Sequence, residues 1–211
     1  KRTKSGLKKG NFMAIPQHFL PRLSLPAIAA PMFILSNPDL VIAQCRAGVI
    51  GSFPSLNARG DGALASWLDR LNGELTDADA PYAVNLIVHG SNPRLAEDLE
   101  LCVQYRVPVV ITSLGAKPEV NAAVHSYGGI VLHDVIDNRF ARKAVEKGAD
   151  GLIAVAAGAG GHAGTQSPFA LIQEIRQWFS GPLALSGAIA HGRSILAAEA
   201  LGAEFAYIGS A

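Results

Sequence analysis

The residues Lys147-Gly148-Ala149-Asp150-Gly151-Leu152-Ile153-Ala154-Val155-Ala156 contain the pattern that predicts the fold of this chain. A glycine typical of a helix end is followed by a small residue and an acid. An apolar run as long as one buried strand comes next. The same order returns at Leu201-Gly202-Ala203-Glu204, ahead of the apolar run 205–209. The chain is therefore expected to repeat a helix–turn–strand unit.

Working outward from this stretch, apolar runs and helix-like stretches alternate along the chain. The expected strands are 27–32, 48–53, 82–88, 107–113, 129–134, 151–156, 183–187 and 205–209. The expected helices are 38–47, 63–71, 94–105, 118–127, 138–147, 168–179 and 194–201. Strict alternation predicts parallel pairing with right-handed crossovers, which an open doubly wound sheet and a closed (β/α)₈ barrel both satisfy.

The number of strands favours the barrel. Eight strands, about 25 residues apart, match a (β/α)₈ TIM barrel better than the five or six strands of a typical open sheet. The turn after the first strand also lacks the Gly-x-Gly-x-x-Gly sequence of a dinucleotide-binding fold. The chain stops at Ala211, so we expect a barrel truncated after strand eight, with strands one and eight exposing apolar surface.

Composition excludes several classes of protein. Hydrophobic residues make up 49% of the 211 residues and charged residues 17%, which excludes disorder and favours buried strands. No apolar run reaches the roughly 18 residues of a membrane span. Cys45 and Cys102 are too few for a disulfide framework. A cytoplasmic protein with no membrane partner is expected, and a homo-oligomer stays open.

The amino-terminal residues are strongly basic. Residues 1–12 hold five of the 18 basic residues and are interpreted as an expression-tag remnant ahead of Met13, so that 13–211 form the barrel domain. Without them, 13 basic residues stand against 17 acidic ones, a net charge of about −4. No basic stripe remains, so a nucleic-acid partner is not expected.

The carboxyl ends of the strands are where a barrel carries its active site. After strand six, Gly158-Ala159-Gly160-Gly161-His162-Ala163-Gly164 lets the backbone approach a flat or anionic group and adds one imidazole. The alternative is that His162 is only a hydrogen-bonded turn residue. Ser186-Gly187-Ala188 and Gly209-Ser210 lie after strands seven and eight, where barrels bind phosphate, although glycine there can also relieve crowding.

Two polar positions in strands have open roles. Asn85 either contacts a cofactor or pairs within the core, because a buried polar group needs a hydrogen bond. His133 and Asp134 are either a pocket-wall pair or a satisfied strand-end pair, and we include His133 among the candidate cofactor contacts. The histidines have no metal-ligand spacing, so no metal site is expected. The chain also lacks the Gly-x-Ser-x-Gly elbow of serine hydrolases.

Taken together, these motifs resemble the nitronate monooxygenase family, also called 2-nitropropane dioxygenases. The likeness covers residues 25–211. The motifs are Ala30-Pro31-Met32, Val84-Asn85-Leu86, Gly160-Gly161-His162-Ala163-Gly164, Ser186-Gly187-Ala188 and Ile208-Gly209-Ser210.

The resemblance implies a barrel that binds FMN and an enzyme that oxidises small alkyl nitronates or nitroalkanes with O₂. His162 would be the catalytic base. The other roles it implies are isoalloxazine neighbours at Pro31, Met32 and Phe33, a flavin-ring contact at Asn85, close backbone approach at Gly160 and Gly161, and phosphate binding at Gly187, Ala188, Gly209 and Ser210.

The sequence departs from the family pattern at two positions and leaves rival functions open. Asp134 and Val155 stand where some members carry Lys and Asp, and the family continues beyond this chain's end. This chain could instead be an NAD(P)H-dependent flavin reductase acting on a quinone or an enoyl substrate, as the resemblance to the wider superfamily also allows. The third alternative is a flavin-free phosphate-binding lyase or isomerase. Such enzymes usually carry lysine or carboxylate side chains at the strand ends, and this chain has few there.

Overall fold

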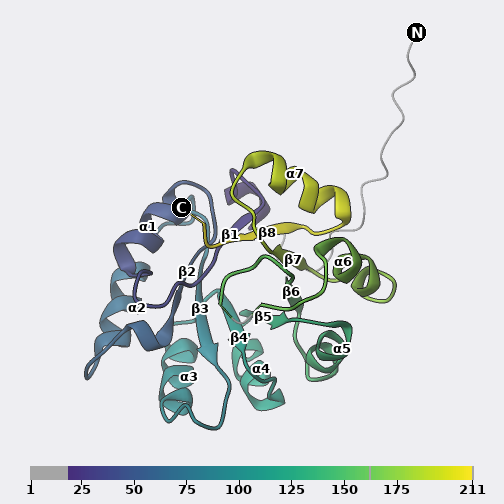
Figure 1. Cartoon of the computed structure of the whole chain (residues 1–211). Helices are drawn as coiled ribbons and strands as arrows, with labels where there is room; N and C mark the ends of the chain where they lie inside the picture. Colours follow the sequence, from purple (N-terminus) through teal and green to yellow (C-terminus); the bar gives the residue numbers. More distant parts are fainter. Residues whose placement is uncertain (1–18, 162, 211) are drawn as a thin grey trace.

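The protein forms a barrel of eight parallel strands. The computed structural model describes residues 19–161 and 163–210. The strand order is β1-β8-β7-β6-β5-β4-β3-β2, with every neighbouring pair parallel. A bridge between Ile28 and Ile50 joins β1 to the start of β2, and the amide of Ala29 donates to the carbonyl of Ile50 at 2.8 Å. The predicted (β/α)₈ barrel is confirmed (Figure 1).

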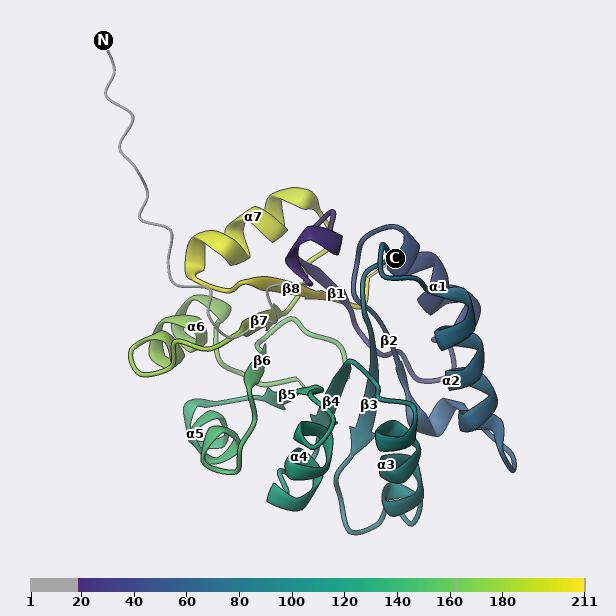
Figure 2. The same cartoon turned by 180° about the vertical axis from the view of Figure 1, so that it is seen from behind.

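Helices alternate with the strands and lie outside them, as both views show (Figure 1, Figure 2). The strands are β1 (Ala27–Ala29), β2 (Gly51–Pro54), β3 (Tyr82–Ile87), β4 (Val109–Ser113), β5 (Ile130–Val135), β6 (Gly151–Val155), β7 (Leu183–Ser186) and β8 (Phe205–Ile208). The α-helices are α1 (Pro38–Arg46), α2 (Ala63–Glu74), α3 (Leu95–Gln104), α4 (Pro118–His125), α5 (Asn138–Glu146), α6 (Pro168–Arg176) and α7 (Gly192–Leu201). Short 3₁₀ turns are η1 (Leu20–Arg22) and η2 (Ser55–Asn57).

The predicted elements agree with these bounds to within a few residues. Among the strands, the first ends at Ala29 instead of residue 32, and the second begins at Gly51 instead of residue 48. Pro31 has no N–H to continue a ladder. The amide of Met32 donates to the hydroxyl of Ser36 at 2.9 Å instead, which turns the chain away from the sheet.

The core is divided by the strand wall into an inner and an outer part. Side chains alternate along each strand, so every second residue points into the barrel. Ile28, Ala83, Ile111, Ile153 and Phe205 belong to one buried cluster inside the barrel. Two further clusters lie between the strands and the helices. The inner apolar layer fills the barrel below its carboxyl end and leaves that end for the site.

The expectation that strand one exposes apolar surface was wrong. Ala27, Ile28 and Ala29 are 2%, 0% and 9% exposed, and Ala206 of β8 is 1% exposed. Ile28 points into the barrel, and the outward positions are alanines, whose small side chains leave little area to cover. The predicted tag, Met13 and His162 lie outside the described residues. Within those residues, no helix is both long and apolar enough to cross a membrane.

Candidate active site at the carboxyl ends of the strands

Strained backbone gathers at the end of the barrel where the strands finish. Four non-glycine residues in the described ranges have a φ in the left-handed region. Three of them, Ile34, Leu114 and Ala188, follow β1, β4 and β7 at φ of 70°, 61° and 51°. Such conformations cost about 1–3 kcal/mol each and cluster at functional sites. Their position marks this rim of the barrel as the candidate site.

The side-chain amide of Asn57, in the turn η2 after β2, holds the loop after β1 in place. Asn57 donates through Nδ2 to the carbonyls of Met32 and Ser36 at 2.9 and 2.8 Å. Its Oδ1 accepts from the amide of Ile34 at 3.0 Å. Three hydrogen bonds from one side chain explain how a β-branched residue keeps a left-handed φ here. The predicted cofactor neighbours Pro31, Met32 and Phe33 are therefore carried on a fixed loop.

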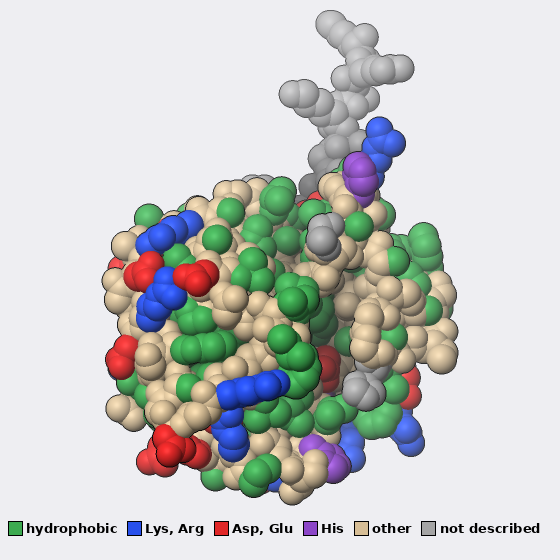
Figure 3. Space-filling model, turned by 60° about the vertical axis from the view of Figure 1, so that its left-hand side comes forward, with side chains coloured by type: hydrophobic (Ala, Val, Ile, Leu, Met, Phe, Trp, Pro, Cys, Tyr) green, Lys and Arg blue, Asp and Glu red, His purple; other side chains and the backbone are tan. Residues whose placement is uncertain are grey.

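Large apolar side chains are exposed on this rim. Phe33, Ile34 and Leu35 after β1 are 62%, 69% and 64% exposed, and Leu114 after β4 is 56% exposed. Figure 3 shows hydrophobic side chains gathered around a hollow on one face of the molecule. Apolar walls of this kind are typical of sites for small organic ligands.

The glycine-rich loop after β6 is closed at its base. Ala157 donates to the carbonyl of Gln166 at 2.8 Å, and Gly164 donates to the carbonyl of Val155 at 3.0 Å. A Cβ added at Gly164 would lie 2.7 Å from the Val155 carbonyl oxygen, so only glycine fits there. At Gly160 and Gly161 an added Cβ would meet no described atom within 4 Å. The base of the loop is fixed, and Gly160 and Gly161 beyond it border open space.

Amide groups without acceptors lie at the ends of β7 and β8. The amide of Ala188 is already used, because it donates to the carbonyl of Gly158 at 2.9 Å. The amides of Gly187, Gly209 and Ser210 have no acceptor within the described part of the chain. Backbone N–H groups in a glycine-containing turn are what proteins use to bind phosphate. Of the predicted phosphate-binding residues, Ala188 thus has a structural role for its amide, while Gly187, Gly209 and Ser210 remain available.

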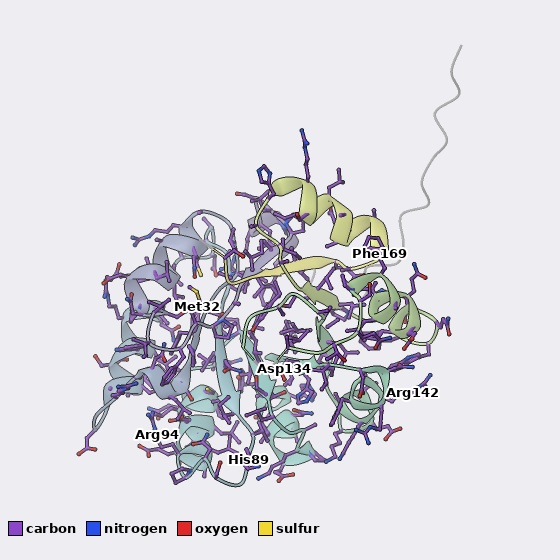
Figure 4. The ribbon with its side chains drawn as sticks, viewed as in Figure 1. Met32, His89, Arg94, Asp134, Arg142 and Phe169 are labelled. Atoms are coloured by element: carbon purple, nitrogen blue, oxygen red, sulfur yellow. The ribbon has the colours of Figure 1, made fainter. Side chains whose placement is uncertain are left out.

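A line of polar side chains crosses β3, β4 and β5 on the inner side of the barrel. Asn85 donates through Nδ2 to the hydroxyl of Ser113 at 2.8 Å and to the carbonyl of Ile111 at 3.1 Å. Ser113 donates to Asp134 Oδ2 at 2.6 Å. Figure 4 shows Asp134 near the centre of the ring of strands, with Arg142 and Phe169 outside it. Burial, and then the nearby Asp134 carboxylate, raise the pKa of Tyr207 on β8 well above its usual value.

His133 is separated from this line by the strand wall. Leu132 packs in the inner cluster, so the neighbouring His133 points outward, toward the helices. It is 6% exposed, and its Nδ1 lies 2.6 Å from the hydroxyl of Thr112, on the same outer face. Burial, with a smaller effect of Lys147, lowers the pKa of His133 to about 4. The structure does not bring His133 together with the other candidate cofactor contacts.

The other candidates within the described residues come together around the barrel mouth. Residues of β1, β3, β6, β7 and β8 from widely separated parts of the chain surround one opening, as the ring order requires (Figure 1). Sequence reasoning gave no role to Asn57 or Ser113. Nothing local separates Asn57 from an ordinary turn asparagine, whereas Ser113 could have been found as the polar end of a buried strand.

Fold and site together define a class: a TIM barrel with unpaired backbone amides at the ends of β7 and β8 and a polar wall on β3 to β5. Residues 59–211 match the nitronate monooxygenase family model. The chain belongs to the nitronate monooxygenase family.

Known proteins similar to this chain have several activities by name. FabK from Thermotoga maritima has 29% identity and a TM-score of 0.80, over 90% of this chain and 59% of that one. A nitroalkane oxidase from Streptomyces ansochromogenes has 24% identity and a TM-score of 0.81, over 91% and 67% of the two chains. A Mycobacterium tuberculosis protein named (3aS,4S,5R,7aS)-5-hydroxy-7a-methyl-1-oxo-octahydro-1H-indene-4-carboxyl-CoA dehydrogenase has 28% identity over 84% of this chain. The chain spans about half (49%) of that relative's length.

Proposed function

We propose that this chain is the FMN-binding barrel of an oxidoreductase that oxidises alkyl nitronates or nitroalkanes with O₂. One observation carries the proposal. The amides of Gly187, Gly209 and Ser210 are free to donate hydrogen bonds to an anion, and the polar wall around Asn85 lies on the opposite side of the ring. β3 and β7 are four strands apart in a ring of eight, so they face each other across the mouth. FMN would match this arrangement: its phosphate would lie at the free amides, and its flat ring would reach the polar wall on the opposite side.

The residues present fit FMN in three respects. Free amides suit its phosphate. Gly160 and Gly161 put no side chain between the β6 loop and the mouth. The Asn85 amide, on the inner wall, can hydrogen-bond to a ring edge. When bound, FMN would supply the electron transfer between substrate and O₂, while the protein supplies position and electrostatics.

His162 is assigned the role of base. It belongs to a loop whose two ends are joined by the Ala157–Gln166 and Val155–Gly164 hydrogen bonds, which fix the base of the loop at the rim. A neutral imidazole at such a tip would remove the α-proton of a nitroalkane, which is general-base work for a group whose pKa is near the working pH. A substrate that already is the nitronate anion has lost that proton, and His162 would then only orient it.

The test compares the two substrate forms. Purified protein should show flavin absorbance after titration with FMN. His162→Asn should reduce kcat/KM for a nitroalkane by a factor on the order of 10²–10⁴ and affect the nitronate much less. Equal losses on both forms would reject the base role. A protein that binds no FMN would reject the proposed cofactor.

A second function has its own support. FabK and the indene-4-carboxyl-CoA dehydrogenase of Mycobacterium tuberculosis share 29% and 28% identity with this chain. An NAD(P)H-dependent flavin reductase acting on a quinone or an enoyl substrate could use the same barrel. Anaerobic loss of flavin absorbance decides between the two: reduction by NADH or NADPH favours the reductase, and reduction by a nitronate favours the oxidase.

A further inference from the structure

The Asn85 side chain offers a ligand only its oxygen. Its amide group has two hydrogens, and Nδ2 donates to two acceptors, the carbonyl of Ile111 at 3.1 Å and the hydroxyl of Ser113 at 2.8 Å. Its Oδ1 has no partner within the described ranges. The unpartnered side-chain atoms that are fully enclosed there are Gln44 Oε1 and Asn121 Oδ1, so Oδ1 of Asn85, on the inner wall, is not fully enclosed.

Asp134 determines the orientation of the Asn85 side-chain amide through its hydrogen bond with Ser113. A serine hydroxyl has one hydrogen, and that of Ser113 goes to Asp134 Oδ2 at 2.6 Å. Toward Asn85 the hydroxyl can therefore only accept. If the carboxylate were absent, the hydroxyl could donate as well, and the amide could turn its oxygen toward Ser113 and its nitrogen toward the mouth. A carboxylate is an acceptor only, so Asp134 sets the direction of every hydrogen bond in the line.

We infer that Ser113 and Asp134 are positioning residues that hold Asn85 with its amide oxygen toward the mouth, so that the site selects a ring N–H donor. The inference rests on the proposed function. Oxidised isoalloxazine has a single ring N–H, at N3, within the pyrimidine edge. The β3–β5 wall thus selects that edge, and the free amides of Gly187, Gly209 and Ser210 select the phosphate on the opposite side.

The arrangement also gives a role to Asp134, which stands where some members of the family carry lysine. A lysine at this position would be a donor with no acceptor capacity, and it could not fix the Ser113 hydroxyl as an acceptor toward Asn85. An aspartate cannot donate to the carbonyl oxygens of a flavin, so it acts through Ser113. In this chain, position 134 contributes to recognition of the ring only through Ser113 and Asn85.

The experiment measures the ratio of the dissociation constants of 3-methyl-FMN and FMN, by fluorescence titration of the 211-residue chain. N3 methylation removes the donor, so we expect the unmodified protein to bind FMN about tenfold more tightly. Ser113→Ala and Asp134→Leu should bring the ratio close to one. Asp134→Asn retains an acceptor oxygen and should keep most of the preference.

Thr112→Val is the matched control. Thr112 is the residue before Ser113 in β4, and its hydroxyl lies 2.6 Å from Nδ1 of His133 on the outer face. Its loss changes a buried hydrogen bond but should leave the ratio unchanged, which separates positioning from a general loss of stability. Ser113→Ala with an unchanged ratio, or an equal change in Thr112→Val, would overturn the inference and leave the proposed cofactor standing. If the unmodified chain bound no FMN, both would be rejected.

Discussion

Two glycines of the β6 loop should respond to the same substitution in opposite ways. Gly164→Ala would put a Cβ 2.7 Å from the carbonyl oxygen of Val155 and 2.9 Å from that of Ile136. Real Cβ atoms do not approach backbone oxygens this closely, and neither oxygen belongs to a flexible side chain. One of the two strand ends would have to move. Overpacking of this kind typically costs about 1–3 kcal/mol, so the unfolding free energy should fall by that amount.

Gly160→Ala is the matched control in the same loop. Its Cβ would meet no described atom within 4 Å, and its φ lies outside the left-handed region. The substitution should change the unfolding free energy by no more than about 0.5 kcal/mol, and the reduced freedom of the unfolded chain favours a small gain. Its expected cost is in ligand binding, because the new methyl group would stand where the cofactor approaches.

The assay has two parts. Urea unfolding of FMN-free protein, followed by circular dichroism, gives the stability of each variant. Titration with FMN gives its affinity. Gly164→Ala should lose stability, and Gly160→Ala should lose FMN affinity while keeping its stability. A Gly164→Ala variant as stable as the parent would refute the steric argument, and full FMN affinity in Gly160→Ala would contradict the assigned cofactor approach.

Three further predictions concern the buried His133, the buried Asp98 and the charge of Asp134 at the mouth. The pKa of His133 is about 4 in the folded protein and about 6.5 unfolded, so the unfolded chain binds more protons between these values. Stability should therefore be lost as pH falls from about 6.5 to 4, by up to about 3 kcal/mol, and His133→Gln should flatten a urea-unfolding pH profile; an unaltered slope would contradict this. Asp98 is 0% exposed and accepts from Ser55 at 2.6 Å and Arg94 at 2.9 Å, so Asp98→Ala should cost roughly 3 kcal/mol in urea unfolding because it leaves a cation and a hydroxyl unpaired; a loss below about 1 kcal/mol would count against that network. Asp134 places negative charge at the mouth, so Asp134→Asn should raise kcat/KM for anionic nitronates relative to neutral nitroalkanes by about tenfold, and an unchanged ratio in steady-state kinetics would rule out the charge effect.

Much of the fold could be predicted from local chemistry. Apolar runs with helix-ending glycines, such as 147–156, reveal a repeated unit, and the number of units selects a barrel because each parallel crossover needs its own helix. The candidate site followed from the same rule, since a barrel's loops meet at one end. The barrel rule also pointed to Gly187 and Gly209 as phosphate-binding residues, and the family resemblance then assigned roles to residues such as Met32 and Phe33, which composition alone could not distinguish from loop residues.

Other properties depend on contacts between distant strands. His133 and Asp134 are adjacent in sequence, yet the strand wall puts one under the helices and the other in the mouth, because successive side chains of a strand point to opposite faces. The direction of the Asn85 amide depends on Ser113 and Asp134, 28 and 49 positions away. The sequence by itself determined the barrel, the loop that carries His162 and the glycine-rich rim. Only the tertiary structure decided which atoms remain free to bind, because hydrogen-bond partners come from neighbouring strands and not from neighbouring residues.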